Sequence, residues 1–174
     1  YVDNYKNYFV SYNNILKLKK DFTLIDENIF IPKNFLVKIN SGQSITLINN
    51  AFIFSDSAWV VDGSKQKIYI SGEKKNFGGG LIISDSNKKS IFKNVTFSYL
   101  SGLKSNSYDK KNEIFITTKT AYQSNNRNSY KEEAFVLDKK SVNLNSQYIL
   151  FWSINFFNNK IILKEIIFEK ISSE

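Results

Sequence analysis

Three aspartates at nearly equal intervals are the residues of this sequence whose spacing could support chemistry. Asp62, Asp85 and Asp109 lie 23 and 24 residues apart. If the chain repeats with that period, their carboxylates form a column with about 4.8 Å between neighbours. Such a column could bind Ca²⁺, or Asp62 and Asp85 could be the paired carboxylates of a glycoside hydrolase. Alternatively each aspartate hydrogen-bonds its own backbone, and the Gly, Ser or Lys that follows each one favours this turn interpretation.

A second group of residues could bind a ligand without transforming it. Asp56 and Trp59 lie in the segment SDSAWVVDG, where an aromatic ring beside carboxylates is suited to stacking on a sugar. The alternative, which we favour, places Trp59 in the core or at the edge of a repeat.

Lysine pairs recur between the apolar segments. Lys88-Lys89 and Lys110-Lys111 are one expected repeat apart, so they could stack into a basic ridge. With Tyr108 nearby, such a ridge could hold an acidic polysaccharide. The favoured alternative is that these lysines keep turns solvated and block strand pairing at edges.

Composition narrows the chemistry further. The 174 residues include no cysteine and no histidine, which excludes thiol nucleophiles, disulfides, thiolate zinc sites and imidazole acid–base groups. No cofactor is expected, because Gly78-Gly79-Gly80 lacks the residues that complete a phosphate-binding loop or a dinucleotide fingerprint. We predict a turn with unusual backbone angles there. No apolar run approaches the roughly 18 to 20 residues of a membrane span.

The net charge of +8 is carried almost entirely by lysine, since Arg127 is the only arginine. A nucleic-acid site is rarely built without arginine, which makes bidentate contacts to phosphates and bases. The abundance of Lys, Asn, Ile, Phe and Tyr also matches AT-rich codon use. We therefore expect a polysaccharide or a partner protein as ligand, rather than nucleic acid. The oligomeric state stays open.

A repeat indicates the elements that must position these residues. Ile45, Ile68, Ile91 and Ile114 open segments at intervals of 23 residues, and WVVDG precedes the similar LIISD by 22 residues. Short β-branched and aromatic runs alternate with clusters of Gly, Ser, Asn, Asp and Lys. This period is too short for a helical repeat or a propeller blade, and fits one coil of a parallel β-solenoid. We predict an all-β, right-handed parallel β-helix with coils of about 22–23 residues.

The chain is expected to be a single domain, residues 1–174. We assign residues 1–22 to an N-terminal cap, 23–103 to regular coils and 104–174 to irregular or capping coils. Near the end, KIILKEIIFEK could form an amphipathic helix, but its β-branched residues favour a strand.

The segment from about Ile29 to Leu103 resembles the right-handed, pectate-lyase-like β-helix segments of bacterial surface proteins, including those beside spore-coat-protein-H-like kinase domains. The resemblance is carried by IFIPKNFLVKINSGQSITLINNAFIFSDSAWVVDG and KIYISGEKKNFGGGLIISDSNKKSIFKNVTFSYLSGL. It covers under half of the chain and ends where polar residues 104–113 replace the next coil. In that family the β-helix is not the catalytic part, so the resemblance implies a scaffold or recognition module. Related folds include polysaccharide lyases and hydrolases.

We therefore expect a non-catalytic module of a secreted or surface protein that acts as a spacer, an adhesive or a glycan-recognition surface. The alternative is a polysaccharide-active enzyme, in which Asp62 and Asp85 would be the hydrolytic pair or a lysine the base of a lyase. The sequence does not begin with methionine, so we expect Tyr1 to be an internal or processed residue, with any signal peptide outside this chain.

Overall fold

The computed structural model describes residues 3–84, 88–101, 108–109, 114–115, 135–137, 142–151 and 154–169. These residues form one short 3-10 helix, η1 (Asn4–Asn7), and sixteen strands. The strands are β1 (Phe9–Tyr12), β2 (Ile15–Leu18), β3 (Phe22–Ile25), β4 (Ile29–Ile31), β5 (Leu36–Asn40), β6 (Ser44–Leu47), β7 (Phe52–Ser55), β8 (Ala58–Asp62), β9 (Ile68–Ser71), β10 (Gly80–Ser84), β11 (Ser90–Ser98), β12 (Tyr108–Asp109), β13 (Ile114–Phe115), β14 (Phe135–Leu137), β15 (Val142–Phe151) and β16 (Ile154–Glu169). In this described part, no helix has the length and apolar character needed to cross a membrane.

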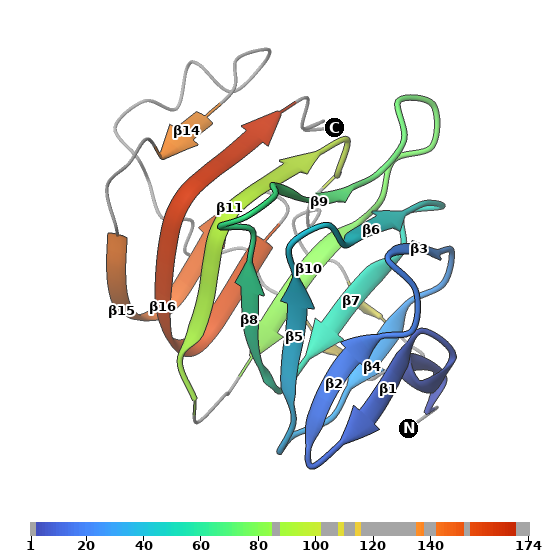
Figure 1. Ribbon diagram of the computed structural model, residues 1–174, viewed down its shortest axis with the longest axis horizontal. Helices are drawn as coiled ribbons and strands as arrows, with labels where there is room; N and C mark the ends of the chain where they lie inside the picture. Colours follow the sequence, from blue (N-terminus) through green and yellow to red (C-terminus); the bar gives the residue numbers. More distant parts are fainter. Residues whose placement is uncertain are drawn as a thin grey trace.

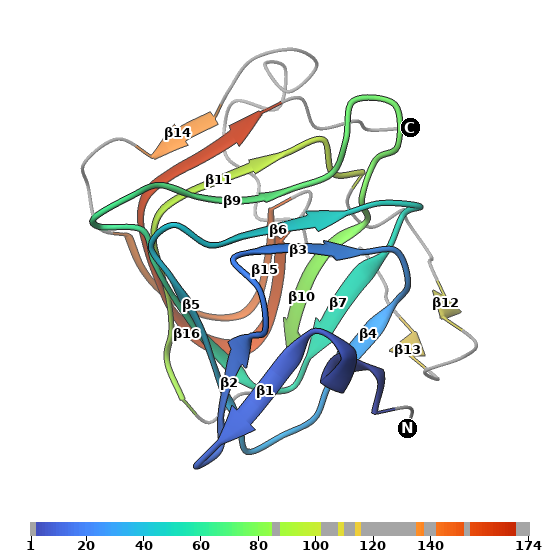
Figure 2. The same cartoon turned by 45° about the vertical axis from the view of Figure 1, so that its right-hand side comes forward.

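From β2 to β11, consecutive strands belong to different faces of a parallel solenoid, and every third strand returns to the same face (Figures 1 and 2). Face A contains β2, β5, β8, the first half of β11 and the middle of β16. Face B contains β3, β6, β9, the second half of β11 and the end of β16. Face C contains β4, β7, β10 and the start of β16. The predicted all-β parallel solenoid is confirmed, with about three turns.

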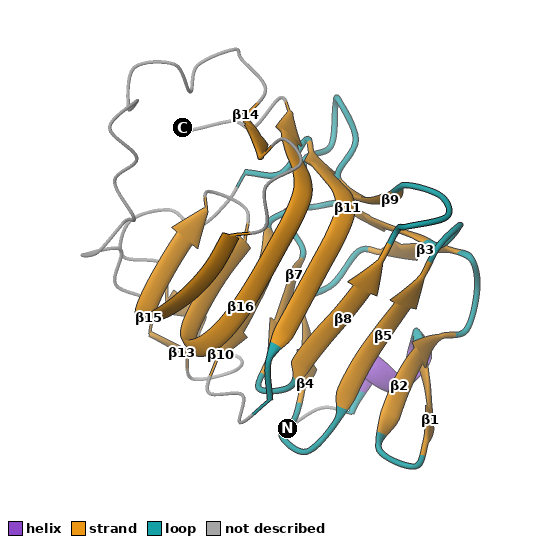
Figure 3. Cartoon of the chain, turned by 60° about the vertical axis from the view of Figure 1, so that its left-hand side comes forward, coloured by secondary structure: helices purple, strands orange, loops and turns teal. Residues whose placement is uncertain are grey.

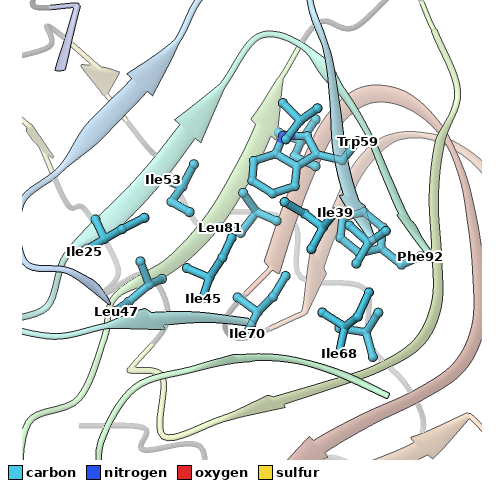
Figure 4. Close-up of a cluster of buried hydrophobic side chains, with 14 of the residues drawn as sticks. Ile25, Ile39, Ile45, Leu47, Ile53, Trp59, Ile68, Ile70, Leu81 and Phe92 are labelled. Carbon is cyan, nitrogen blue, oxygen red and sulfur yellow. The ribbon is translucent and has the colours of Figure 1, made fainter. Parts of the chain in front are cut away.

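The alternation of side chains along each strand explains why this sequence closes around a core. In β5, Val37 and Ile39 point inward and are buried, whereas Lys38 is half-buried and Asn40 is exposed. Parallel pairing then stacks the apolar side chains of successive coils on one another in the interior. Ile25 pairs with Leu47, for example, and all the labelled side chains in Figure 4 lie in this buried cluster. Burying one isoleucine or leucine side chain completely contributes roughly 1.5–3 kcal/mol to the free energy of folding.

The stacking register differs from the 23-residue repeat in the later coils. Early coils have the predicted length: the backbone of Phe35 bonds the Ser57 side chain 22 residues later. The next coil at this corner is longer, because Trp59 bonds Ser90 at a separation of 31 residues. The predicted series of isoleucines is therefore out of register: Ile45 pairs with Ile70 rather than Ile68, and Ile91 pairs with Val60 of face A. The apparent match between WVVDG and LIISD is also wrong, because β8 lies in face A and β10 in face C.

Both ends of the solenoid carry antiparallel strands. At the C-terminal end, β15 and β14 pair with the outer edge of β16, as seen for β15 in Figure 3. The KIILKEIIFEK segment falls largely in β16, so the strand interpretation is confirmed. The β16 strand also returns the chain to face C after β11 left it at the end of face B.

The N-terminal end of the solenoid carries the β1–β2 hairpin and the η1 helix. The antiparallel hairpin of β1 and β2 leads directly into face A, so coil stacking begins at Ile15, inside the segment 1–22 assigned to a cap. The η1 helix contacts β4, and Asn4 Nδ2 donates a hydrogen bond of 2.8 Å to the Asn28 carbonyl. The Tyr8 hydroxyl lies 3.3 Å from a Glu27 carboxylate oxygen and 3.5 Å from an Asp26 oxygen.

The triple glycine does not form the predicted turn: the turn lies at Lys74-Lys75, Gly78 bridges Leu100 and Gly80 begins β10. Glycine is needed here because neighbouring coils approach closely. A Cβ on Gly79 would lie 2.3 Å from Phe52 ring carbons and 2.7 Å from the Asn50 carbonyl oxygen, while Gly80 has φ of 142°. A side chain at position 79 must therefore displace a neighbouring coil.

We predict that Gly79→Ala destabilises the protein by about 1–3 kcal/mol, because the added methyl overpacks the contact with Phe52. Urea unfolding followed by circular dichroism measures the change. Ser71→Ala, at an outward and half-buried position, is the control and should change stability by less than about 0.5 kcal/mol. Equal stability of Gly79→Ala and the parent chain would contradict the close approach.

A second prediction concerns alkaline stability. Burial, with smaller contributions from the Glu27 and Asp26 charges, raises the pKa of Tyr8 from 10.0 to about 12. Because the folded state favours the protonated phenol, this stabilisation is present below pH 10 and is lost as the pH rises towards 12. The parent chain should lose stability faster than Tyr8→Phe across that window, as measured by thermal melts. A stability difference that does not change with pH would contradict this account.

Candidate functional site

The structure brings three of the predicted ligand-binding residues to one corner. Asp56 lies between β7 and β8, and Lys88-Lys89 lies between β10 and β11, so both turns connect face C to face A in successive coils. The Asp56 backbone N–H bonds the Ile31 carbonyl at 2.9 Å, which stacks this turn on the coil below. Lys33 lies in that lower turn. The corner is therefore of mixed charge rather than a purely basic ridge.

The remaining members of the predicted basic ridge cannot be added to this corner. Lys110 and Lys111 lie outside the described residues. Tyr108 belongs to β12, which pairs with β13, and its side chain is not described. The ridge with an acidic polysaccharide therefore stays a prediction.

Trp59 is a core residue and is not available to a ligand. Its side chain has no exposed surface, and its indole Nε1 donates a 2.9 Å hydrogen bond to Ser55 Oγ inside the solenoid (Figure 4). Its ring also meets Phe9 edge-on at 6.4 Å between centroids. The sugar-stacking role considered for Trp59 is wrong, and the core interpretation is confirmed, because position 59 points inward in β8.

Asp62 has the environment of a turn residue. It is exposed at the end of β8, and its Oδ1 accepts a 3.0 Å hydrogen bond from the Ser64 backbone N–H. Hydrogen bonds from the Ser64 side chain and backbone lower the pKa of Asp62, with Lys93 and Lys65 acting in the same direction. This carboxylate is therefore ionised at neutral pH, which suits a turn and disfavours a general acid.

The expected column of aspartates is wrong in register. The residues paired with Asp62 in neighbouring strands are Asn40 and Lys93. Asp85 lies outside the described residues, but it directly follows β10 of face C, whereas Asp62 ends a strand of face A. Asp109 pairs with Ile114 in the separate β12–β13 hairpin. Among the described residues, no group of three or more acidic side chains is placed to hold a metal ion.

The most distinctive surface is the outward side of face B, which the sequence analysis did not predict. Phe22 is 78% exposed, Leu24 54% and Tyr69 49%, and all three project from β3 or β9. In the strand register Phe22 pairs with Ser44, which pairs with Tyr69. Figure 2 shows the three strands side by side. Exposed apolar side chains gathered on one face mark sites of interaction more often than scattered ones.

The second row of this surface is also uncharged. Leu24 pairs with Thr46, which pairs with Ser71, and the Ser44, Thr46 and Ser71 side chains are each half-buried. We call these six outward positions of β3, β6 and β9 the aromatic–hydroxyl surface: Phe22, Leu24, Ser44, Thr46, Tyr69 and Ser71. Alternation in DFTLID and KIYIS could have located it, since apolar residues there occupy both sides of the strand.

Known proteins give no further indication of the site. No family model matches the chain, and no curated protein or solved structure shows a significant match. The architecture of the parallel β-helix is established by the structure alone.

Proposed function

We propose that this chain is a non-catalytic β-solenoid recognition module whose aromatic–hydroxyl surface binds an extended, neutral polysaccharide. The observation that carries the proposal is the pair of exposed rings, Phe22 and Tyr69, on an uncharged surface with hydroxyl groups between them. The C–H face of a pyranose ring packs on an aromatic ring, and its equatorial hydroxyls bond to Ser and Thr side chains.

The spacing of the surface favours an extended chain over a single sugar. Phe22 and Tyr69 lie two strands apart in register, a separation of about 9.6 Å at the usual distance between strands. One strand spacing is close to the length of one unit in an extended β-linked polysaccharide. A chain lying across the strands would therefore meet a ring at every second unit.

Charge favours a neutral ligand at this surface. None of its six residues is Lys, Arg, Asp or Glu, whereas the outward positions of face A include Lys17 in β2 and Lys38 in β5. The corner formed by Lys33, Asp56 and Lys88-Lys89 is the second place for a ligand, and an acidic polysaccharide would suit its lysines.

The case against catalysis rests on Asp62. Its lowered pKa and its lysine neighbour keep it ionised, and its column neighbours offer no second carboxylate. The resemblance to β-helix segments of bacterial surface proteins supports a secreted or cell-surface location and a role as a recognition or adhesive module.

Titration with neutral and acidic soluble polysaccharides at about 150 mM salt tests the proposal. We expect Phe22→Ala and Tyr69→Ala each to weaken binding of a neutral β-glucan or mannan about fivefold, since each loses roughly 1 kcal/mol of ring contact. Tyr12→Ala is the matched control, because Tyr12 is 74% exposed but lies on β1 beside face A. No binding of any neutral polysaccharide, or equal weakening by Tyr12→Ala, would overturn the assignment.

The same polysaccharides should also be assayed for reducing ends and unsaturated products. We expect no turnover by the parent chain, with Asp62→Asn identical to it. If the parent chain releases products and Asp62→Asn abolishes this release, the chain is a polysaccharide-active enzyme and the non-catalytic proposal is wrong.

A further inference from the structure

One strand at the N-terminal end of the solenoid lacks a neighbour on its outer edge. β2 is paired by β1 and β4 is contacted by η1, but within the described residues β3 pairs only with β6. An uncovered strand edge is a template for pairing with another chain.

The hydrogen bonds between β3 and β6 show which backbone N–H and C=O groups of β3 point towards its uncovered edge. The carbonyls of Asp21 and Ile25 accept hydrogen bonds from Ser44 N at 2.7 Å and from Ile48 N at 3.0 Å, so they point towards β6 and the residues that follow it. Because backbone groups alternate along a strand, the N–H and C=O groups of Phe22 and Leu24 point the opposite way. These two residues also have the most exposed apolar side chains of face B.

The sequence around β3 is complementary to itself when reversed. A twofold axis perpendicular to the sheet pairs an edge strand with its own copy in the antiparallel sense. Centred on Thr23, that pairing places Phe22 opposite Leu24 of the second copy and Lys20 opposite its Asp26. In this register, Phe22 of one copy and Leu24 of the other form a hydrogen-bonded pair. The N–H and C=O groups of both residues then bond across the interface.

The flanking charges fit the same register. Lys19 falls opposite Glu27 of the second copy, next to the Lys20–Asp26 pair. Lys19, Lys20 and Asp26 are exposed, and the Tyr8 hydroxyl holds the Asp26 and Glu27 carboxylates at the end of β3. Two apolar pairs and four opposite-charge pairs thus form across one twofold axis.

We propose that two copies of this chain associate through their β3 edges as an antiparallel, twofold-symmetric dimer. The strands β9, β6 and β3 of each copy then form one continuous sheet. The side chains of Phe22 and Leu24 stay on the outward side, so pairing lengthens the aromatic–hydroxyl surface instead of covering it. The dimer does not depend on the proposed polysaccharide ligand.

The first test is the association state of the full chain by sedimentation equilibrium. We expect a reversible dimer. Lys20→Glu and Asp26→Lys should each weaken it about tenfold, because like charges then meet twice across the axis. The double variant Lys20→Glu/Asp26→Lys should restore the parent affinity. A parent chain that stays monomeric up to roughly millimolar concentration, or a double variant no tighter than the single ones, would overturn the proposal.

A second test reads the register directly. The chain contains no cysteine, so a single introduced thiol can form only an intermolecular disulfide. Thr23→Cys places two thiols opposite each other in a non-hydrogen-bonded pair, where the Cα atoms lie about 4.5 Å apart and can be bridged. Thr46→Cys on the interior strand β6 is the matched control.

We expect Thr23→Cys to form a disulfide-linked dimer under mild oxidation, and Thr46→Cys to stay monomeric. Equal cross-linking of the two variants would overturn the β3 register. Circular dichroism and melting temperature confirm that each variant keeps the solenoid. If the dimer fails while Phe22→Ala still weakens polysaccharide binding, only the association is refuted.

Discussion

Parallel pairing in register between coils determines where the side chains of this solenoid lie. Each strand can bury its inward side chains only against the coils above and below it, so one position fixes the next along the column. The pairs Ile25–Leu47 and Ile45–Ile70 show the consequence in the core. The same rule acts outside, where it aligns Phe22, Ser44 and Tyr69 although they are far apart in sequence. The surface is therefore a product of the core's register.

The solenoid could be predicted because alternation and turn residues recur along the chain, whereas the register could not. Loop length adds little free energy, so a corner tolerates extra residues without disturbing the strands that it connects. The Glu73–Asn76 turn and the residues before Ser90 lengthen the third coil in this way. A fixed period then aligns strands from different faces, and this error produced the aspartate column.

The binding surface could not be predicted, because the sequence does not determine which side of each strand faces inward. A shift of one residue exchanges the two sides completely. Trp59 lies between acidic residues yet points inward, where the Ser55 hydroxyl satisfies its indole. Phe22 belongs to an apolar run that suggests core, yet it is 78% exposed. The turn role of Asp62 was predictable because local backbone chemistry, not packing, determines it.

The proposed recognition takes place on the outward side of β3, β6 and β9. Amide chemical-shift mapping of the isotope-labelled chain during titration with a neutral β-linked polysaccharide tests it most directly. We expect the largest shifts on the strands that carry Phe22, Thr46 and Tyr69. Shifts confined to the corner of Asp56 and Lys88 would contradict it and move the binding site to the turns between faces C and A.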